Sequence, residues 1–358
     1  MRKQLIVIAL ALFLVGSYGA VFADEAVLID FSQLKADIPD PNNQSSMVNN
    51  KATMMDFSGT AGASYTDDQK KQMRTSLAIR NWDVVLSSSS KTTTNQALSL
   101  TAEAPVASGK YKDQAVMGIR VHFPVAEFNS WARIQPPFEI PAFERTVVDG
   151  QGNVTDPPAG TPNSPLTRFE GNYDQNTKIT TALGVVKNVG VIKSVAVTVR
   201  GLNFPHGLSV VLKDADGNEQ TLFMGYLNFD GWKELVWNNP AYVTDVRNRE
   251  LRIFPLYPKS TPMIKLAGFL VTRDAASEGG DFVTYIKDVK ILYDEAVIQT
   301  GRDIDDENIW GIVNKKETER KNIESKAFGA QQVLRYLEET KEDQNANPNW
   351  AETPAPTK

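Results

Sequence analysis

Apolar and polar residues alternate along several segments of this chain, and this alternation constrains the fold more than any other feature of the sequence. Between positions 191 and 200, valines recur at every second residue, interrupted by Lys193, and polar residues fill the positions between them. The valines that share one face are Val191, Val195, Val197 and Val199, opposite Ser194, Thr198 and Arg200. A period of two is the pattern of a β-strand with one face buried, so this segment is predicted to be a strand.

Similar short segments recur along most of the chain, with turn signals between them. Residues 115–125 and 283–293 alternate in the same way, and shorter candidates lie at 208–213, 221–226, 233–237, 250–256 and 264–272. The dipeptides Asp216-Gly217 and Asp230-Gly231 are typical of tight turns. Many short strands without helical patterns between them predict an all-β fold, an antiparallel β-sandwich of the jelly-roll kind. Residues 28–31 are predicted to form a first strand that pairs late in the fold.

Composition divides the chain into four parts. The strand patterns place the β-sandwich domain at residues 24–300, with an irregular loop at 147–178 that is rich in Gly, Pro, Asn and Asp. Residues 301–342 are predicted to be a helical tail of two helices or one weakly docked helix, because helix formers replace the strand pattern there. Residues 343–358 are rich in Asn, Pro, Glu and Thr and are predicted to be disordered.

The tail carries two further signals. The acids Asp305, Asp306 and Glu307 suit a helix N-terminus, because negative side chains there interact favourably with the helix dipole. Apolar residues then follow at helical spacing, and we expect this stripe to dock on a partner. Its members are Ile323, Ala327, Leu334 and Leu337.

The N-terminus predicts export. Arg2 and Lys3 precede an apolar run, and Val21-Phe22-Ala23 places a small residue immediately before Asp24. This is the pattern of a cleavable signal peptide over residues 1–23, and the run is too short to be a transmembrane anchor. The exported chain is therefore expected to begin at Asp24 and to be soluble.

The charge and residue counts exclude several classes of function. The chain has 38 basic and 43 acidic side chains, and cleavage removes Arg2 and Lys3, so the excess of acids grows from five to seven. Such a balance argues against a nucleic-acid partner, which would favour a clustered basic face. The chain has no cysteine and only two histidines, His122 and His206. Thiol chemistry is excluded and histidine chemistry is scarce, so we predict no enzyme activity, no metal and no cofactor.

The acidic clusters have simpler explanations than catalysis. Asp214-Ala-Asp216-Gly-Asn218 resembles the start of a calcium loop, but its glycine comes too early and no glutamate closes the loop, so a hairpin turn is favoured. The acids at 303–307 serve a helix start better than a pair of glycosidase carboxylates. The Ser/Thr run at 87–94 is predicted to be an exposed loop or edge strand, with a modification site as the alternative.

Two tryptophans in the segment 229–242 raise the possibility of a sugar-binding surface. If 233–237 is a strand, Trp237 shares a face with Leu235 and is predicted to lie in the core. Trp232 follows the turn at Asp230-Gly231, where an aromatic ring can cap the core or stay partly exposed. An exposed Trp232 with Glu234 and Asn238 beside it would suit a carbohydrate ligand.

Several separate segments resemble one family. They are residues 195–203, Asp216-Gly217, 225–233, 236–242, 256–258, 281–290 and 29–31. Together they resemble the outer-layer, or sheath, proteins of spirochaete periplasmic flagellar filaments. The resemblance covers most of the exported chain, and the signal peptide and helical tail fit it.

The resemblance implies a structural sheath subunit in the periplasm. Its partners would be flagellin core subunits and neighbouring sheath subunits, and it would contribute to filament stiffness, shape and motility through many repeated contacts. It implies no active site. The alternatives are a periplasmic carbohydrate-binding β-sandwich module that uses Trp232, and an export-linked hydrolase.

Overall fold

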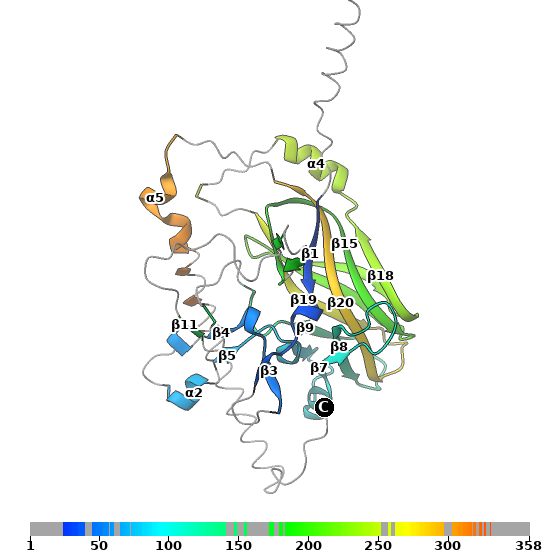
Figure 1. Cartoon of the computed structure of the whole chain (residues 1–358). Helices are drawn as coiled ribbons and strands as arrows, with labels where there is room; N and C mark the ends of the chain where they lie inside the picture. Colours follow the sequence, from blue (N-terminus) through cyan, green and yellow to red (C-terminus); the bar gives the residue numbers. More distant parts are fainter. Residues whose placement is uncertain are drawn as a thin grey trace, which may run out of the picture.

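Two antiparallel sheets face each other in the computed structural model of the chain (Figure 1). The structure describes residues 24–39, 45–56, 58–60, 65–71, 73–140, 147–148, 154–155, 172–174, 179–181, 183–251, 257–258, 262–296 and 303–316, with isolated positions up to 330. The first sheet, which we call the β20 sheet, has the order β18 (Asp230–Asn238), β15 (Val189–Leu202), β20 (Gly280–Glu295), β8 (Ala115–Phe123) and β7 (Leu100–Pro105), with β1 (Asp24–Asp30) also paired to β20. The second, the β19 sheet, has the order β17 (Glu219–Tyr226), β16 (Gly207–Asp214), β19 (Met263–Arg273), β9 (Ser130–Gln135) and β6 (Asp83–Leu86), with β14 (Val185–Lys187) also paired to β19.

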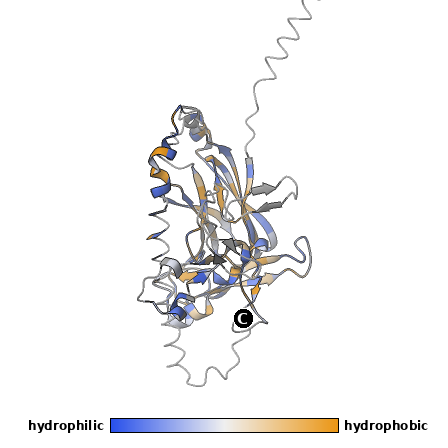
Figure 2. Ribbon diagram, turned by 60° about the vertical axis from the view of Figure 1, so that its left-hand side comes forward, coloured by the Kyte–Doolittle hydropathy of each residue, from blue (hydrophilic) through white to orange (hydrophobic). Residues whose placement is uncertain are grey.

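The core lies between the inner faces of these sheets. In β15 the residues Val195, Val197 and Val199 are fully buried, as their alternation predicts. Leu208 and Val210 of β16 belong to the same apolar cluster. Apolar and polar residues alternate along the strands in Figure 2, as expected where each strand has one face in the core. The predicted antiparallel β-sandwich is confirmed.

The first strand pairs with the last, as the sequence predicts. β1 runs antiparallel to β20, from Asp24 opposite Tyr293 to Asp30 opposite Asp288. Lys287 joins the two strands, because its Nζ lies 3.2 Å from Asp30 Oδ2 and 2.8 Å from Asp288 Oδ2. Burial alone would lower the pKa of Lys287, but the hydrogen bond that it donates to Asp288 and the charge of Asp30 outweigh this effect and raise that pKa.

One predicted strand is wrong at its first two residues, and the rest of it lies outside the described residues. Residues 250–256 were expected to be extended, but Glu250 and Leu251 end the helix α4 (Tyr242–Leu251), and 252–256 lie outside the described residues. The side chain of Asn239 organises the helix start by accepting the N–H of Ala241 at 2.9 Å. The Tyr242 hydroxyl then donates to Asp294 at 2.7 Å. These contacts fix the start of α4, which carries the chain in helical form as far as Leu251.

The Ser/Thr run at 87–94 was expected to be an exposed loop or edge strand, and it is largely an exposed turn with two buried serines. It forms a turn that leads into the helix α3 (Thr93–Leu98), with the Thr92 hydroxyl accepting the N–H of Asn95 as an N-cap. Ser87 and Ser90 are buried, and their hydroxyls lie 2.9 Å apart. The other residues of the run, Ser88, Ser89 and Lys91 to Thr94, are exposed, so most of the run fits the expected exposed loop.

Small elements complete the described chain. The short helix is α2 (Asp67–Lys71), and the 3-10 turns are η1 (Phe31–Gln33), η2 (Lys51–Thr53), η3 (Ser58–Thr60) and η4 (Ile79–Asn81). The two-stranded ladders pair β2 (Ile38–Pro39) with β3 (Met47–Asn49), β4 (Met55–Asp56) with β5 (Arg74–Thr75), β10 (Val147–Val148) with β11 (Val154–Thr155), and β12 (Asn172–Asp174) with β13 (Ile179–Thr181). The last two ladders lie at the predicted loop 147–178, most of which is outside the described residues.

The tail begins with the helix α5 (Asp306–Trp310). Asp305 is its N-cap and accepts the N–H of Asn308, so the predicted helix start is confirmed. The helix ends at Gly311, whose left-handed φ of 56° favours glycine. Residues 312–316 are helical again, so the tail is broken into more than one helical segment.

Candidate interaction surfaces

The three residues considered for sugar binding share the outward face of β18. Trp232, Glu234 and Asn238 pair with Arg200, Thr198 and Ser194 of β15, whose valines point the other way into the core. Leu235 lies on the inner face and is buried, and Trp237 packs against the core, as predicted. Glu234 and Asn238 are exposed and four residues apart, about 13 Å along an extended strand.

Trp232 is half-buried because a loop folds over it. Tyr111, in the loop between β7 and β8, contacts Trp232 edge-to-face with 5.0 Å between ring centroids. The ammonium group of Lys287 lies 5.6 Å from the same Tyr111 ring. The ring of Trp232 therefore already has an aromatic partner within the chain, and only part of it is open to a ligand.

Carbohydrate binding through Trp232, with Glu234 and Asn238 beside it, stays a prediction. If Trp232 stacks on a sugar, Trp232→Ala should weaken glycan binding by about fivefold, because one stacked aromatic ring contributes on the order of 1 kcal/mol. A glycan array followed by titration calorimetry measures this, with an unchanged circular dichroism spectrum as the check on folding. Failure of the unaltered chain to bind any glycan would end this alternative.

Only part of the predicted tail stripe can be located. The side chain of Ile323 is 69% exposed. Ala327, Leu334 and Leu337 lie outside the described residues. Two apolar residues of α5, Ile309 and Trp310, are also exposed, at 60% and 67%.

A second aromatic surface lies on the outward face of the β19 sheet, and we call Trp131, Phe223 and Tyr226 the aromatic patch. Their side chains are 43%, 48% and 50% exposed. Trp131 lies opposite Thr272, Thr272 opposite Gly207, and Gly207 opposite Tyr226, so this row crosses four strands on one face. Phe223 contacts Tyr226 edge-to-face at 5.3 Å.

Gly207 of β16 lies in this row between Thr272 and Tyr226. A Cβ atom on Gly207 would lie 2.6 Å from the Thr272 hydroxyl and 2.9 Å from the ring of Phe223. The missing side chain therefore allows Phe223 to lie against the backbone of β16. The resulting surface is a shallow apolar area between Trp131 on one side and Phe223 with Tyr226 on the other.

This patch was not among the predicted surfaces, although the sequence carries a signal for it. In β9, Ala132 and Ile134 are buried, so Trp131 and Arg133 point to the outward face. In β17, Leu222 is buried, so the adjacent Phe223 points outward in the same way. One outward aromatic residue is ordinary, and only several on neighbouring strands of the same face would indicate a contact surface. That these three residues share one face depends on the order of strands in the sheet.

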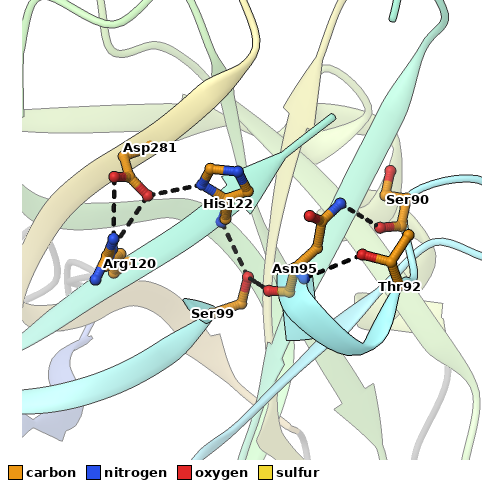
Figure 3. A network of polar contacts seen from close by, with 7 residues as sticks. All are labelled: Ser90, Thr92, Asn95, Ser99, Arg120, His122 and Asp281. Atoms are coloured by element: carbon orange, nitrogen blue, oxygen red, sulfur yellow. Dashed lines mark hydrogen bonds and ion pairs between the residues drawn. The ribbon is translucent and has the colours of Figure 1, made fainter. Parts of the chain in front are cut away.

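The two histidines have structural roles in the described chain. Figure 3 shows Asp281 of β20 between Arg120 and His122 of β8, where it receives hydrogen bonds of 3.0–3.1 Å from Arg120 and lies 2.9 Å from Nδ1 of His122. The hydrogen bonds from Arg120, and then that from His122, lower the pKa of Asp281. The hydroxyl of Ser99 accepts the backbone N–H of His122, so this network connects β8 to the end of α3 (Figure 3).

The described residues contain neither a cluster of metal-binding side chains nor a helix that could cross a membrane. Asp214 binds its own hairpin, accepting the backbone N–H of Asn218 at 2.8 Å and the Asn218 side-chain amide at 3.0 Å, so the predicted turn is confirmed. The described part of the chain holds no group of three or more metal-binding side chains. Its helices are all too short or too polar to cross a membrane.

These features define a two-layer β-sandwich protein with an outward aromatic patch and an acidic, partly apolar helical tail, an arrangement suited to contacts with other molecules. Residues 46–302 match the family described as flagellar filament outer layer protein FlaA. The chain is 49% identical over 344 residues to the flagellar filament outer layer protein of Treponema pallidum, covering 95% of this chain and 94% of that one. It is 44% identical to the protein of the same description from Spirochaeta aurantia, covering 95% and 93%. The chain therefore belongs to the flagellar filament outer layer protein family, as its sequence resemblance predicts.

Solved structures resemble it much more weakly. A carbohydrate-binding module in complex with β-1,4-galactotriose is 9% identical, with a TM-score of 0.26, over 60% of this chain and 88% of that one. Likeness at this level says nothing about what the chain binds.

Proposed function

We propose that this chain is a sheath subunit of the periplasmic flagellar filament and lies outside a core of flagellin subunits. The observation that carries the proposal is its relationship, over 95% of its length, to proteins described as the outer layer of flagellar filaments. A layer must contact what it covers and its own neighbours. The proposed partners are therefore the flagellin core and adjacent sheath subunits.

The periplasm is the compartment that fits the N-terminus. The predicted signal peptide ends at residue 23, and β1 begins at Asp24, so cleavage there leaves the first strand complete. A chain exported in this way would meet the filament in the space between the inner and outer membranes.

A sheath subunit acts by contact and needs no catalytic group. Each contact between subunits can be weak, because a filament repeats it many times and the neighbouring contacts reinforce one another. A layer built in this way resists bending of the core, so it sets the stiffness and curvature of the filament. Such a layer requires different patches on the two sides of each contact, because contacts between like patches close into dimers.

Isolated filaments test this function. Periplasmic filaments purified from the source cells should contain this chain together with flagellins, and labelled antibodies should bind along the filament surface. Filaments from cells that lack the chain should be thinner and altered in curvature under the electron microscope, and the cells should swim more slowly. Purified filaments that contain flagellins without this chain would disprove the proposal.

A further inference from the structure

Each of the two large sheets ends in two edge strands, and three of these four edges are protected. In the β19 sheet, β6 is four residues long, and the side-chain amide of Gln96 in α3 donates to the carbonyl of Val84 at 2.6 Å. A β-bulge interrupts the pairing of β17 with β16. In the β20 sheet, β7 lies against η4, where the Thr101 hydroxyl donates to the carbonyl of Ile79 at 2.8 Å, and it ends at Pro105, which has no N–H. Short, bulged, covered or proline-containing edges resist pairing with other chains.

β18 is the fourth edge, and it has none of these protections. Its nine residues, Asp230–Asn238, contain no proline and pair with β15 without a shift in register. Figure 1 shows β18 at the outer edge of its sheet. Val236, in the second half of the strand, is 46% exposed. A long, regular and exposed edge is a surface on which another strand can pair.

Two hydrogen bonds at the ends of β18 show which of its main-chain groups point to this edge. The N–H of Asn203 donates to the carbonyl of Phe229, and the N–H of Asn239 donates to the carbonyl of Lys193, both at 2.9 Å. In an antiparallel pair, every second residue directs both its N–H and its C=O to the same neighbour. The odd-numbered residues of β18 therefore bond to β15, and the even-numbered residues direct both groups away from it. Among the described residues these groups have no hydrogen-bond partner; they belong to Asp230, Trp232, Glu234, Val236 and Asn238.

The free main-chain groups define the partner as an extended strand, because only an extended chain presents donors and acceptors at the same spacing. β18 of a second copy is such a strand, and within the described chain it is the one edge that the copy leaves unprotected. Two identical strands can pair antiparallel about a two-fold axis, so each copy satisfies the edge of the other.

Side chains select the register of this pair. Centring the axis on Lys233 or on Glu234 would place two like charges directly opposite each other, which is destabilising. Centring it on Leu235 avoids this and, among the registers that do so, retains the most main-chain hydrogen bonds. In that register each of four residues with free groups lies opposite another such residue of the second copy; they are Trp232, Glu234, Val236 and Asn238.

We propose that two copies of this chain pair through β18, antiparallel and centred on Leu235, so that their β20 sheets become one continuous sheet. Glu234 then lies opposite Val236 of the second copy, and Lys233 lies opposite Trp237. The contact joins like surfaces and closes on itself, so it forms a dimer. It goes beyond the proposed function and does not depend on it. In a sheath, this dimer would be the unit, and contacts between unlike patches would join one dimer to the next.

Cysteine cross-linking tests both the contact and its register, because the natural chain has no cysteine. The exported chain is prepared once as Glu234→Cys and once as Val236→Cys. The two positions oppose each other across the proposed pair, about 5.5 Å apart between Cα atoms, a distance that a disulfide spans. Oxidation of an equal mixture should give disulfide-linked dimers that contain one chain of each kind. Either variant alone should stay unlinked, because its own two cysteines lie beyond the roughly 7 Å limit.

Val236→Pro tests the main-chain hydrogen bonds of the edge. The N–H of Val236 points away from β15, so proline removes no bond within the chain and blocks the edge. Sedimentation equilibrium should show dimers that dissociate at least about tenfold more readily than those of the unaltered chain. Val236→Thr is the matched control, because threonine keeps the N–H and the branched shape, and it should associate like the unaltered chain. Melting temperatures check folding, and the cross-linking result stands without the proline variant.

Three outcomes would overturn the inference: an unaltered chain that stays monomeric at every concentration, a mixture of cysteine variants that forms no linked dimer, or dimers that a folded Val236→Pro chain keeps intact. Binding to purified flagellin filaments separates these outcomes from the proposed function. A monomeric chain that coats filaments, and loses this binding with Val236→Pro, would assign the edge to flagellin and leave the sheath function standing. A chain that dimerises through β18 and binds no filament would keep the contact and lose the proposed function.

Discussion

Replacing Arg273 by methionine should lower the free energy of unfolding by about 3 to 5 kcal/mol, because it removes every hydrogen bond that this buried guanidinium donates to four main-chain carbonyls. Arg273 ends β19 and is 1% exposed. Its guanidinium group donates hydrogen bonds of 2.8–3.3 Å to four main-chain carbonyls, those of Ala126, Phe128, Ser277 and Glu278. Methionine keeps much of the side-chain volume and none of the donors.

The positions of these carbonyls explain the size of the effect. Ala126 and Phe128 belong to the loop between β8 and β9, and Ser277 and Glu278 to the loop between β19 and β20. Each loop crosses from one sheet to the other. Arg273 therefore holds one end of the sandwich together, and its loss weakens both connections between the layers.

Chemical denaturation monitored by tryptophan fluorescence measures the change. Arg200→Met is the matched control, because Arg200 is exposed on β15, and it should alter the stability by less than about 0.5 kcal/mol. Equal stabilities for the two variants would show that the carbonyl contacts of Arg273 contribute nothing.

The sequence predicted the parts of the fold that depend on local pattern. The alternation in 191–200 predicted the buried valines of β15, and the acids after Asp303 predicted the start of α5. Both signals lie within a few residues of the structure they specify. The alternation pattern failed at 250–251, which are the last two residues of the helix α4. The start of that helix is held by a distant residue, because the Tyr242 hydroxyl donates a hydrogen bond to Asp294 of β20.

The surfaces could not be predicted in the same way, because they join residues that are distant in the chain. Trp232 was predicted to cap the core or stay partly exposed, but its own segment does not show that Tyr111 from the β7–β8 loop packs against the ring. Trp131 and Tyr226 lie in one row on one face of the sheet because Thr272 of β19 and Gly207 of β16 lie between them in register. The order of strands in a sheet is a property of the whole fold, and a single strand pattern does not contain it.

Acid should destabilise this chain through His206, by about 3 kcal/mol between pH 6.5 and pH 4. His206 is 3% exposed and lies among phenylalanine rings, 5.1 Å from Phe123 and 4.7 Å from Phe282 between centroids. Neither ring nitrogen has a hydrogen-bond partner among the described residues. Burial, and then the charge of Arg273, lower the pKa of His206 from 6.5 to about 4, although Asp274 opposes this.

The sign of the pH dependence follows from this lowered pKa. Below pH 6.5 the unfolded chain gains a proton at His206, while the folded chain stays neutral there down to about pH 4. Proton binding therefore favours the unfolded chain. The contribution is fully present above pH 6.5 and is lost as the pH falls towards 4.

His206→Phe isolates this contribution, because phenylalanine fills the same aromatic site and cannot bind a proton. Urea denaturation of both chains at each pH gives two stability curves, and subtraction removes the titration of the carboxylates they share. The stability of the unaltered chain relative to the variant should fall by about 3 kcal/mol as the pH drops through the window. Parallel curves would contradict a buried, neutral His206.

Arg273→Met provides an independent check on the cause of the shift. Removing the cation should raise the pKa of His206 towards its ordinary value, because one of the two effects that lower it is lost. Nuclear magnetic resonance can follow the ring directly, since the chain has only two histidines and His122→Gln leaves His206 as the single signal. A pKa that does not move when Arg273 is replaced would assign the whole shift to burial among the phenylalanine rings.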